Sequence, residues 1–422
     1  MVTSRERLET TLEHRQPDRV CVDIGGCSNT TMHASTVSRL RGTLLGQGDH
    51  RVRIAHQMMM TGEIDDELRG ALPCDVVGVG GSSSSFGIPN KDWKPWDMPD
   101  GTPVMVPGEF SVTADANGDL LEYPQGDTSV APSGRMPAGG FYFDSIVRQE
   151  PIDESRLDPA DNCEEFSFLG DRQVADFGAE ARRLTEMTDY GIFLTLPGVW
   201  GYGDPGMIPG AALKHPKGIR DPEEWYISLV ARPDYIHAVF ERQTEIALAN
   251  IARIAAEVGD NGQVARVCSA DFGGQMGPLF SPRTYRQLFS PYYRRINHTI
   301  HQLTNWKTFK HCCGSIYDLI PDMIEDGFDI LNPNQTSAAK MDARTLKREF
   351  GEQIVFWGGG VETQTTLPFG TAEEVYREVR ERIDIFNDGG GYVFSAIHNI
   401  QANVPVANIL AMFQAVRDSW VA

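Results

Sequence analysis

A recurring order of helical segment and short apolar strand is the feature that most restricts the fold of this chain. From about residue 175 onward, amphipathic stretches alternate with apolar runs, and a polar or glycine-rich loop follows each run. Repeated units of this kind build sheets of parallel strands. The expected helices are 174–188, 233–258, 282–304, 316–326, 342–350 and 372–387, and the expected strands are 20–24, 192–196, 264–267, 307–310, 330–331, 354–356 and 392–394.

The apolar runs predict about eight strands, which is the number that closes a (β/α)8 barrel. A doubly wound sheet carries the same alternation, but it normally has a phosphate-binding loop after its first strand. Gly25-Gly26-Cys27-Ser28 matches no such fingerprint. We therefore predict an α/β fold in which residues 1–422 form a single TIM-barrel domain.

Two segments fall outside the repeat. Residues 4–12 place Leu8 and Leu12 on one helical face, which predicts a helical N-terminal extension. Residues 91–144 are dense in turn-forming residues, and Asn117-Gly118 is typical of a tight turn between strands. We expect a β-hairpin insertion there. Because exposed strand edges can pair between subunits, we also expect a homodimer.

Charge and apolar patterning exclude several kinds of partner. The chain has 38 Lys and Arg against 58 Asp and Glu, a net charge of −20, so nucleic acid is not an expected partner. It lacks an apolar run of membrane-spanning length, and its first residues lack the order of a signal peptide. Seven cysteines are an odd number, which argues against a disulfide framework. We expect a cytoplasmic protein with reduced thiols and no membrane partner.

Polar side chains follow five successive predicted strands, at the point where each strand ends. In a barrel these positions converge on one mouth, and so many hydrogen-bonding or ligating groups predict a pocket there. The polar or ligating residues are Asp271 and Gln275 after 264–267; His311, Cys312 and Cys313 after 307–310; Asn332 and Gln335 after 330–331; Glu362 and Gln364 after 354–356; and His398 after 392–394, with the aromatic Phe272 and Trp357 among them.

His311 and Cys313 form the sharpest local signal. A His-x-Cys pair at a strand end can direct an imidazole and a thiolate at one soft cation such as Zn²⁺. A third ligand must come from elsewhere, and His398 is the first candidate, with Glu362, Asp271 and Cys312 as further candidates. The alternative is that Cys313 is a packed thiol and His311 a hydrogen-bonded interior histidine.

Several motifs together resemble the uroporphyrinogen decarboxylase superfamily. The resemblance implies a (β/α)8 barrel, and it is strongest from about residue 260 to the C-terminus. It rests on the strings at residues 311–315, 357–364, 367–371 and 404–409, together with residues 4–7 and 17–20.

That superfamily contains two chemistries, decarboxylation of a tetrapyrrole and zinc-dependent methyl transfer. Its decarboxylases carry an arginine-rich signature after the first strand, because a substrate with many carboxylates demands cations. Residues 25–33 contain no arginine, so decarboxylation of a porphyrinogen is not expected. The methyltransferase branch has a His-x-Cys that matches His311 and Cys313. Its third ligand, usually cysteine, lies in the final loop, where this chain has His398.

The resemblance implies a zinc-dependent methyltransferase or demethylase of a small O-, N- or S-methylated compound. A methyl-bearing heteroatom leaves poorly unless it is coordinated or protonated. The methyl acceptor would be a corrinoid carried on a separate protein, or tetrahydrofolate. Two alternatives remain: a metal-free decarboxylase of a small organic acid, and a binding scaffold with a degenerate site.

The remaining candidates receive roles around the metal. Asp271 and Glu362 would orient the substrate or move a proton, although a carboxylate such as Asp271 also commonly fixes a loop. Amides would hold the polar edge of the substrate, or else brace loops, and an aromatic rim would suit a flat or quaternary substrate, or else belong to the core. The amides are Gln275, Asn332, Gln335 and Gln364, and the aromatic residues are Trp200, Phe272 and Trp357.

Overall fold

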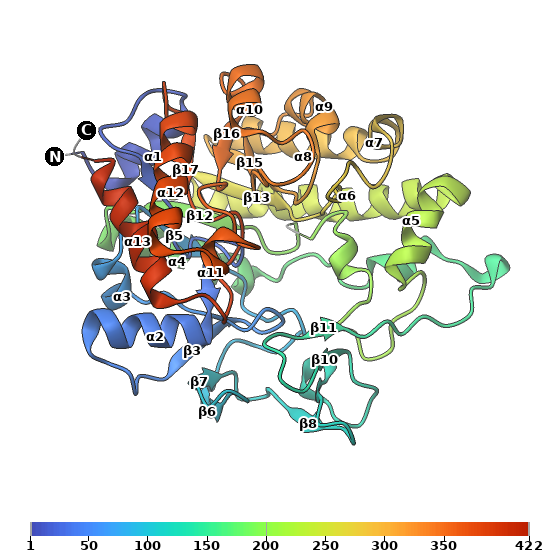
Figure 1. Ribbon diagram of the computed structural model, residues 1–422. Coiled ribbons are helices and arrows are strands. Elements are labelled where there is room, and N and C mark those ends of the chain that lie inside the picture. The colour runs from blue at the N-terminus through green and yellow to red at the C-terminus, as the bar shows by residue number, and fades with distance from the viewer. Residues whose placement is uncertain (1, 200, 421–422) are drawn as a thin grey trace.

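Eight parallel strands form the central sheet of the computed structural model, which describes residues 2–199 and 201–420 (Figure 1). Asp75 N donates to Val22 O at 2.8 Å between the two outermost strands, so the sheet curls into a nearly closed barrel. The predicted TIM barrel is confirmed. In sheet order the strands are β1 (Cys21–Val22), β17 (Tyr392–Phe394), β16 (Val355–Trp357), β15 (Ile330–Asn332), β14 (Lys307–His311), β13 (Val264–Cys268), β12 (Gly191–Thr195) and β5 (Val76–Val79).

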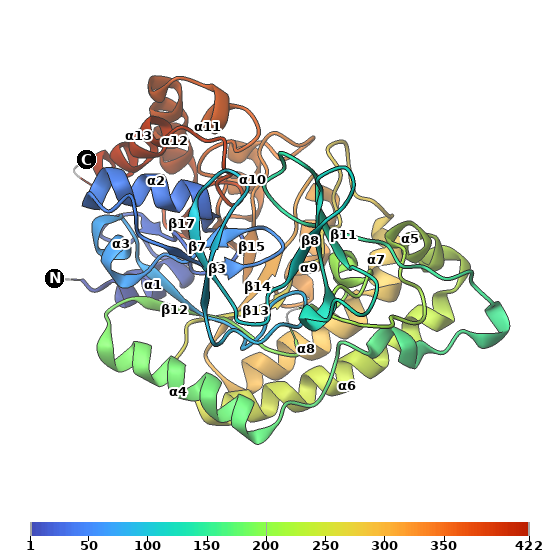
Figure 2. The same cartoon turned by 90° about the horizontal axis from the view of Figure 1, so that it is seen from below.

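Amphipathic helices cover the outside of the barrel (Figures 1 and 2). The longest, α6 (Pro233–Val258), buries Ile236, Val239, Phe240 and Ala247, a spacing that places them on one face. The other helices are α2 (Ala34–Leu45), α3 (Asp66–Ala71), α4 (Asp171–Met187), α5 (Pro222–Ala231), α7 (Pro282–Leu288), α8 (Ser290–Leu303), α9 (Ile320–Glu325), α10 (Ala343–Phe350), α11 (Thr366–Phe369), α12 (Ala372–Phe386) and α13 (Val406–Asp418). Within the described residues, no helix has both the length and the apolar character needed to cross a bilayer.

The predicted N-terminal helix is α1 (Ser4–Leu12), and it begins at a capping box between Thr3 and Glu6. Leu8 and Leu12 are buried in the same apolar cluster as residues of the barrel interior. A side chain at Gly191 would collide with Leu8, so the helix packs tightly against the start of β12. This helix therefore closes the amino-terminal end of the barrel.

Aromatic rings fill the barrel interior. The ring centroids of Phe193 and Phe309 lie 4.8 Å apart, and each packs edge-to-face against Trp357. The Trp357 indole donates to Asp23 Oδ2 at 2.9 Å, which gives its buried N–H a partner. The barrel is thus a packed core, and only its carboxyl-terminal mouth offers room for chemistry.

The insertion is larger than the predicted hairpin. Its strands are β6 (Lys94–Asp97), β7 (Pro103–Val106), β8 (Val112–Ala114), β9 (Leu120–Glu122), β10 (Gly134–Met136) and β11 (Asp144–Ser145). One sheet has the order β11-β10-β9-β8, and in the other β7 joins β3 (Val52–His56), beside β4 (Thr61–Gly62) and β2 (Met32–His33). The expected Asn117-Gly118 turn connects β8 and β9. The insertion crosses one end of the barrel (Figure 2), and Ser133 Oγ donates to Ala211 O in the long loop after β12.

Local differences from the predicted elements have physical causes. The strand β5 was not predicted because it is short and contains Gly78, where a side chain would collide with Gly26 O. The predicted helix 282–304 is divided into α7 and α8, since Pro291 in the first turn of α8 cannot continue a helix. Short 3₁₀ turns complete the structure at Pro124–Gly126, Glu154–Arg156, Pro159–Cys163, Pro205–Met207 and Tyr317–Leu319.

Glu122 in β9 provides a test of the packing of the insertion. Its side chain is 0% exposed, and neither carboxylate oxygen has a hydrogen-bond partner within the described part of the chain. Burial raises the pKa of Glu122 well above its usual range. Because the folded protein then holds a proton that the unfolded chain releases above about pH 4.3, the free energy of unfolding falls as pH rises, by up to about 1.4 kcal/mol per pH unit.

We therefore expect Glu122→Gln to flatten the fall of the melting temperature between about pH 5 and 8. The control is Glu109→Gln, which changes an exposed carboxylate in the same insertion and should keep the wild-type slope. Thermal unfolding followed by circular dichroism at several pH values measures both. Equal slopes in the Glu122→Gln variant and the wild type would contradict the expectation.

Candidate metal centre

Two histidines and a cysteine meet at the carboxyl ends of β14 and β17. His311 is the last residue of β14, Cys313 lies two residues further on, and His398 follows β17. Their ligand atoms all lie within 4.8 Å of one another, and His311 Nε2 is 3.3 Å from Cys313 Sγ. The structure therefore brings together the three residues predicted as metal ligands, here called the His/Cys/His triad.

A hydrogen-bonded chain fixes the tautomer of His311. The Asn332 amide donates to Trp357 O at 2.9 Å, and a carbonyl oxygen can only accept, so Asn332 Oδ1 must face the imidazole. His311 Nδ1 donates to this Oδ1 at 2.6 Å. The proton therefore resides on Nδ1, and the lone pair of Nε2 points into the site. Such an outer partner is typical of metal-binding histidines.

His398 Nδ1 lies beside Asn399 Oδ1. His398 Nε2 is 3.1 Å from Asn29 Nδ2, which can only donate because Asn29 Oδ1 accepts from Arg266, so this Nε2 is also an acceptor. Burial lowers the pKa of His311 to about 3 and lowers the pKa of His398 below its usual value. Both rings are neutral at neutral pH, the form in which imidazole binds metals.

Cys313 supplies the sulfur. Burial raises the pKa of its thiol well above the usual range, and the nearby Asp271 carboxylate raises it further. The backbone N–H of Cys313 donates to Asp271 Oδ1 at 2.7 Å, which fixes the position of the loop. The adjacent thiol of Cys312 accepts instead from Phe272 N and is fully buried, so it points away from the triad.

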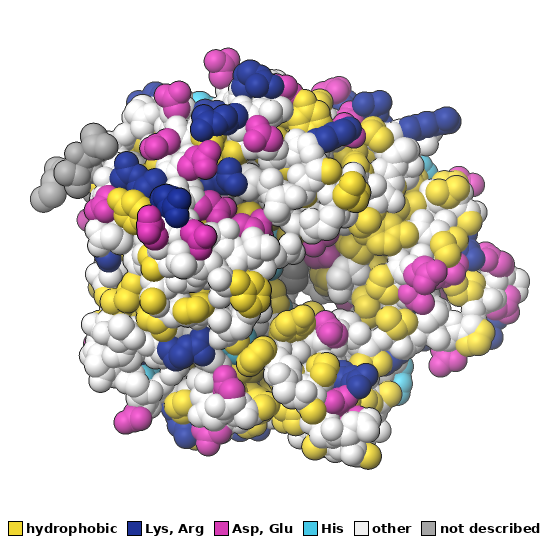
Figure 3. Space-filling model, viewed as in Figure 1, with side chains coloured by type: hydrophobic (Ala, Val, Ile, Leu, Met, Phe, Trp, Pro, Cys, Tyr) yellow, Lys and Arg dark blue, Asp and Glu magenta, His cyan; other side chains and the backbone are white. Residues whose placement is uncertain are grey.

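Carboxylates border the triad on one side. Asp271 Oδ1 lies 3.7 Å from His311 Nε2, and the Asp271 side chain is 48% exposed. Asp204, in the loop after β12, was not predicted as a site residue. Burial and the charge of Asp271 raise the pKa of Asp204 to about 7, so these two carboxylates lie close enough to interact. Figure 3 shows a hollow where the insertion meets the barrel, with acidic and apolar side chains at its border.

Asn29 and Arg266 complete the site, and neither was predicted from the sequence. Asn29 Nδ2 lies 3.2 Å from His311 Nε2 and 3.1 Å from His398 Nε2. Its Oδ1 accepts from Arg266 Nη2 at 2.6 Å. The only available signal was a charged residue inside the apolar strand β13, because an arginine there must find polar partners within the barrel.

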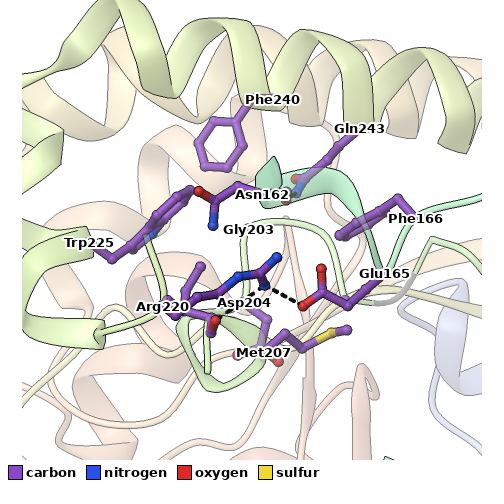
Figure 4. Close-up of a pocket in the computed structure, with 12 residues that line it drawn as sticks. Asn162, Glu165, Phe166, Gly203, Asp204, Met207, Arg220, Trp225, Phe240 and Gln243 are labelled. Carbon is purple, nitrogen blue, oxygen red and sulfur yellow. Dashed lines mark hydrogen bonds and ion pairs between the residues drawn. The ribbon is translucent and has the colours of Figure 1, made fainter. Parts of the chain in front are cut away.

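A small cavity lies beside Asp204, which belongs to the loop after β12 (Figure 4). It measures about 20 Å³, enough for one water molecule. Gln243 Oε1 is buried at its wall with no partner among the described residues, and a water molecule would satisfy it. Arg220 binds Glu165 across the cavity and donates to Ile208 O. The contacts of Arg220 thus brace a loop of the mouth. The cavity itself is too small for a substrate.

The structure moves two predicted rim aromatics into the core. Trp357 is 0% exposed inside the barrel, because its side chain points along the interior face of β16. Phe272 is also buried, and it packs against Phe280, Tyr285 and Phe289 on the helix side of the sheet. Neither ring can contact a substrate at the mouth. The third predicted aromatic, Trp200, lies outside the described residues.

The predicted amides mostly brace loops. Asn332 holds His311, as described above, and the Gln335 side chain accepts from Gly314 N at 2.8 Å. Gln275 and Gln364 are exposed. Glu362 uses Oε1 to accept from Gln364 N, and it is not among the groups close enough to share a metal with the triad.

Comparisons with known proteins agree with this fold. Residues 213–419 match the family model of uroporphyrinogen decarboxylase (URO-D). A methyltransferase from Methanosarcina mazei has a similar structure, with a TM-score of 0.53, 16% sequence identity and 99% of each chain covered. No curated protein matches the chain in sequence.

Two glycoside-cleaving proteins overlap only partly with the chain. Endo-glycoceramidase II from Rhodococcus sp. has a TM-score of 0.32 at 13% identity, over 56% of this chain and 62% of its own. A GH10 endoxylanase from a sugarcane soil metagenome has a TM-score of 0.28 at 9% identity, over 42% and 68%.

The matched region contains β14 to β17, and with them His311, Cys313 and His398. It also contains the motif strings at 311–315, 357–364 and 404–409 that first indicated the family. Taken with the barrel architecture, the match confirms the predicted resemblance to the uroporphyrinogen decarboxylase superfamily over residues 213–419.

Proposed function

We propose that this protein is a zinc-dependent methyltransferase that demethylates a small O-, N- or S-methylated compound. The methyl acceptor in this proposal is a corrinoid on a separate protein, or tetrahydrofolate. The observation that supports it is the His/Cys/His triad, whose two neutral imidazole nitrogens and one sulfur lie within 4.8 Å of one another. The methyltransferase from Methanosarcina mazei with a similar fold is consistent with this activity.

The donor set fits zinc. Two nitrogens and one sulfur suit a borderline-soft ion, and a set of three protein ligands would leave room for a substrate atom on the metal, as in catalytic zinc sites. When bound, zinc supplies a Lewis acid that polarises the bond between a heteroatom and its methyl group. His311, Cys313 and His398 would hold it.

The surrounding residues orient the ligands and handle protons. Asn332 and Asn399 keep both Nε2 lone pairs directed at the site. The Asp271 carboxylate accepts from the Cys313 backbone N–H at 2.7 Å and its charge raises the pKa of the Cys313 thiol, so it lies where it would take the thiol proton if the sulfur bound a metal. Its exposed side can also hold the polar end of a substrate.

The decarboxylase alternative has less support from the site. Decarboxylation of an organic acid needs cations that bind the substrate carboxylate. Arg266 lies on β13 at the barrel mouth. Its guanidinium donates to Ser28, Asn29 and Ser269. Its guanidinium is therefore engaged by the protein's own side chains.

We expect Cys313→Ser to lose bound zinc, with affinity reduced at least roughly ten-fold, because a hydroxyl is a poor ligand for a soft metal. Cys312→Ser is the matched control, since that thiol points away from the triad, and it should retain zinc. Metal analysis and chelator competition measure both. Full zinc content and turnover in Cys313→Ser, or equal losses in both variants, would defeat the proposed ligand set.

Variants of His398 distinguish a metal ligand from a proton donor. His398→Cys should retain zinc because a thiolate suits the same tetrahedral site, whereas His398→Ala should lose at least about an order of magnitude in affinity. Metal titration beside a turnover assay distinguishes the outcomes. If His398→Ala binds zinc at full affinity but no longer turns over, His398 is a proton donor and not a ligand.

Variants of Asn332 test whether this residue orients the His311 ring. Asn332→Ala removes the acceptor for Nδ1–H, so we expect zinc affinity to fall by about 10- to 100-fold while all three ligands remain. Asn332→Asp keeps an acceptor at the same place and should restore most of the affinity. Chelator competition provides the measurement. An Asn332→Ala variant with wild-type affinity would show that His311 does not depend on this partner.

A further inference from the structure

Asn29 occupies the space between the two imidazoles of the triad. Its Nδ2 lies 3.2 Å from His311 Nε2 and 3.1 Å from His398 Nε2. Both Nε2 atoms are unprotonated, because each Nδ1 carries the proton, so the carboxamide donates to both. An unprotonated imidazole nitrogen has one lone pair, which either accepts a hydrogen bond or binds a metal. The hydrogen bonds of Asn29 therefore compete directly with metal coordination.

Arg266 fixes Asn29 in this orientation. A guanidinium has only donors, so Asn29 must turn its Oδ1 toward Arg266 and its Nδ2 toward the imidazoles. The bond from Arg266 Nη2 to Asn29 Oδ1 is 2.6 Å long, and the two side chains are only 4% and 7% exposed. Arg266 is held in turn by Ser28 and Ser269. The position of Asn29 is thus built into the barrel mouth.

We propose that Asn29 is a gate of the metal centre. Its carboxamide donates to both Nε2 lone pairs, so a metal ion enters only as Asn29 withdraws from the imidazoles. The inference rests on the proposed metal site. It adds that Asn29 controls how a metal ion enters that site. Since an entering ion must replace two hydrogen bonds, the gate favours ions that bind imidazole strongly, such as Zn²⁺, over hard ions such as Mg²⁺.

The experiment compares zinc affinity and the rate of zinc binding in the wild type, Asn29→Ala and Ser28→Ala. Removing two hydrogen bonds that oppose the metal should tighten zinc binding about ten-fold or more in Asn29→Ala and should speed it. Ser28→Ala also loses a contact with Arg266 but none with the imidazoles, so its affinity should stay within about two-fold of wild type. Chelator competition and stopped-flow mixing with ZnCl₂ measure affinity and rate.

A second variant keeps the test valid if Asn29→Ala does not fold. Asn29→Leu keeps the branched shape of the side chain but cannot donate, so a folded Asn29→Leu protein should also bind zinc more tightly than wild type. Circular dichroism checks the fold of each variant. Unchanged or weaker zinc affinity in folded Asn29→Ala and Asn29→Leu overturns the gate.

Adding Cys313→Ser to Asn29→Ala separates this inference from the proposed function. If zinc binding depends on Cys313 but is not tightened by Asn29→Ala, the gate is wrong and the metal site stands. If the double variant binds zinc as tightly as Asn29→Ala, the metal does not use the triad, and both the gate and the proposed function fail.

Discussion

The hydrogen bond from His311 Nδ1 to Asn332 Oδ1 decides which nitrogen faces the barrel mouth, and the chemistry of the site depends on it. The barrel itself sets this contact, because His311 and Asn332 are paired residues at the ends of the neighbouring strands β14 and β15. Asn332 is oriented in turn by the carbonyl of Trp357 on β16. Residues of three adjacent strands thus orient the Nε2 lone pair of His311 toward the barrel mouth.

The alternation of side chains along β14 supports the same site from the other face of the sheet. His311 points into the mouth, whereas Lys310 points toward the helices, where its ammonium lies 4.1 Å from the centre of the Phe272 ring. Lys310 Nζ also donates to Ala270 O at 2.8 Å. This contact holds the loop that carries Asp271. A buried lysine therefore helps to fix a carboxylate on the opposite side of the strand.

The parts of the site that could be predicted are those that the sequence brings together or places by regular spacing. His311 and Cys313 are two residues apart at a strand end, and His398 was located by its position after the last strand. The barrel followed from the same repeat of helices and strands. The strand β5 was not predicted, since four residues that include a glycine carry too little apolar pattern.

The other parts depend on contacts that no local pattern contains. Asn29 and Arg266 are 237 positions apart in the chain and meet only because β1 and β13 deliver them to one mouth. Trp357 was expected on the rim because it ends a strand. A strand buried on both faces gives no alternation from which to distinguish the interior side chains from the others.

The central claim is that the His/Cys/His triad binds zinc through two nitrogens and one sulfur. The most direct measurement is zinc K-edge X-ray absorption on the zinc-loaded protein. The account predicts a sulfur shell at about 2.3 Å and a nitrogen shell at about 2.0–2.1 Å, with the sulfur shell absent from Cys313→Ser. A zinc environment of oxygen and nitrogen alone in the wild type, or a sulfur shell unchanged by Cys313→Ser, would contradict it.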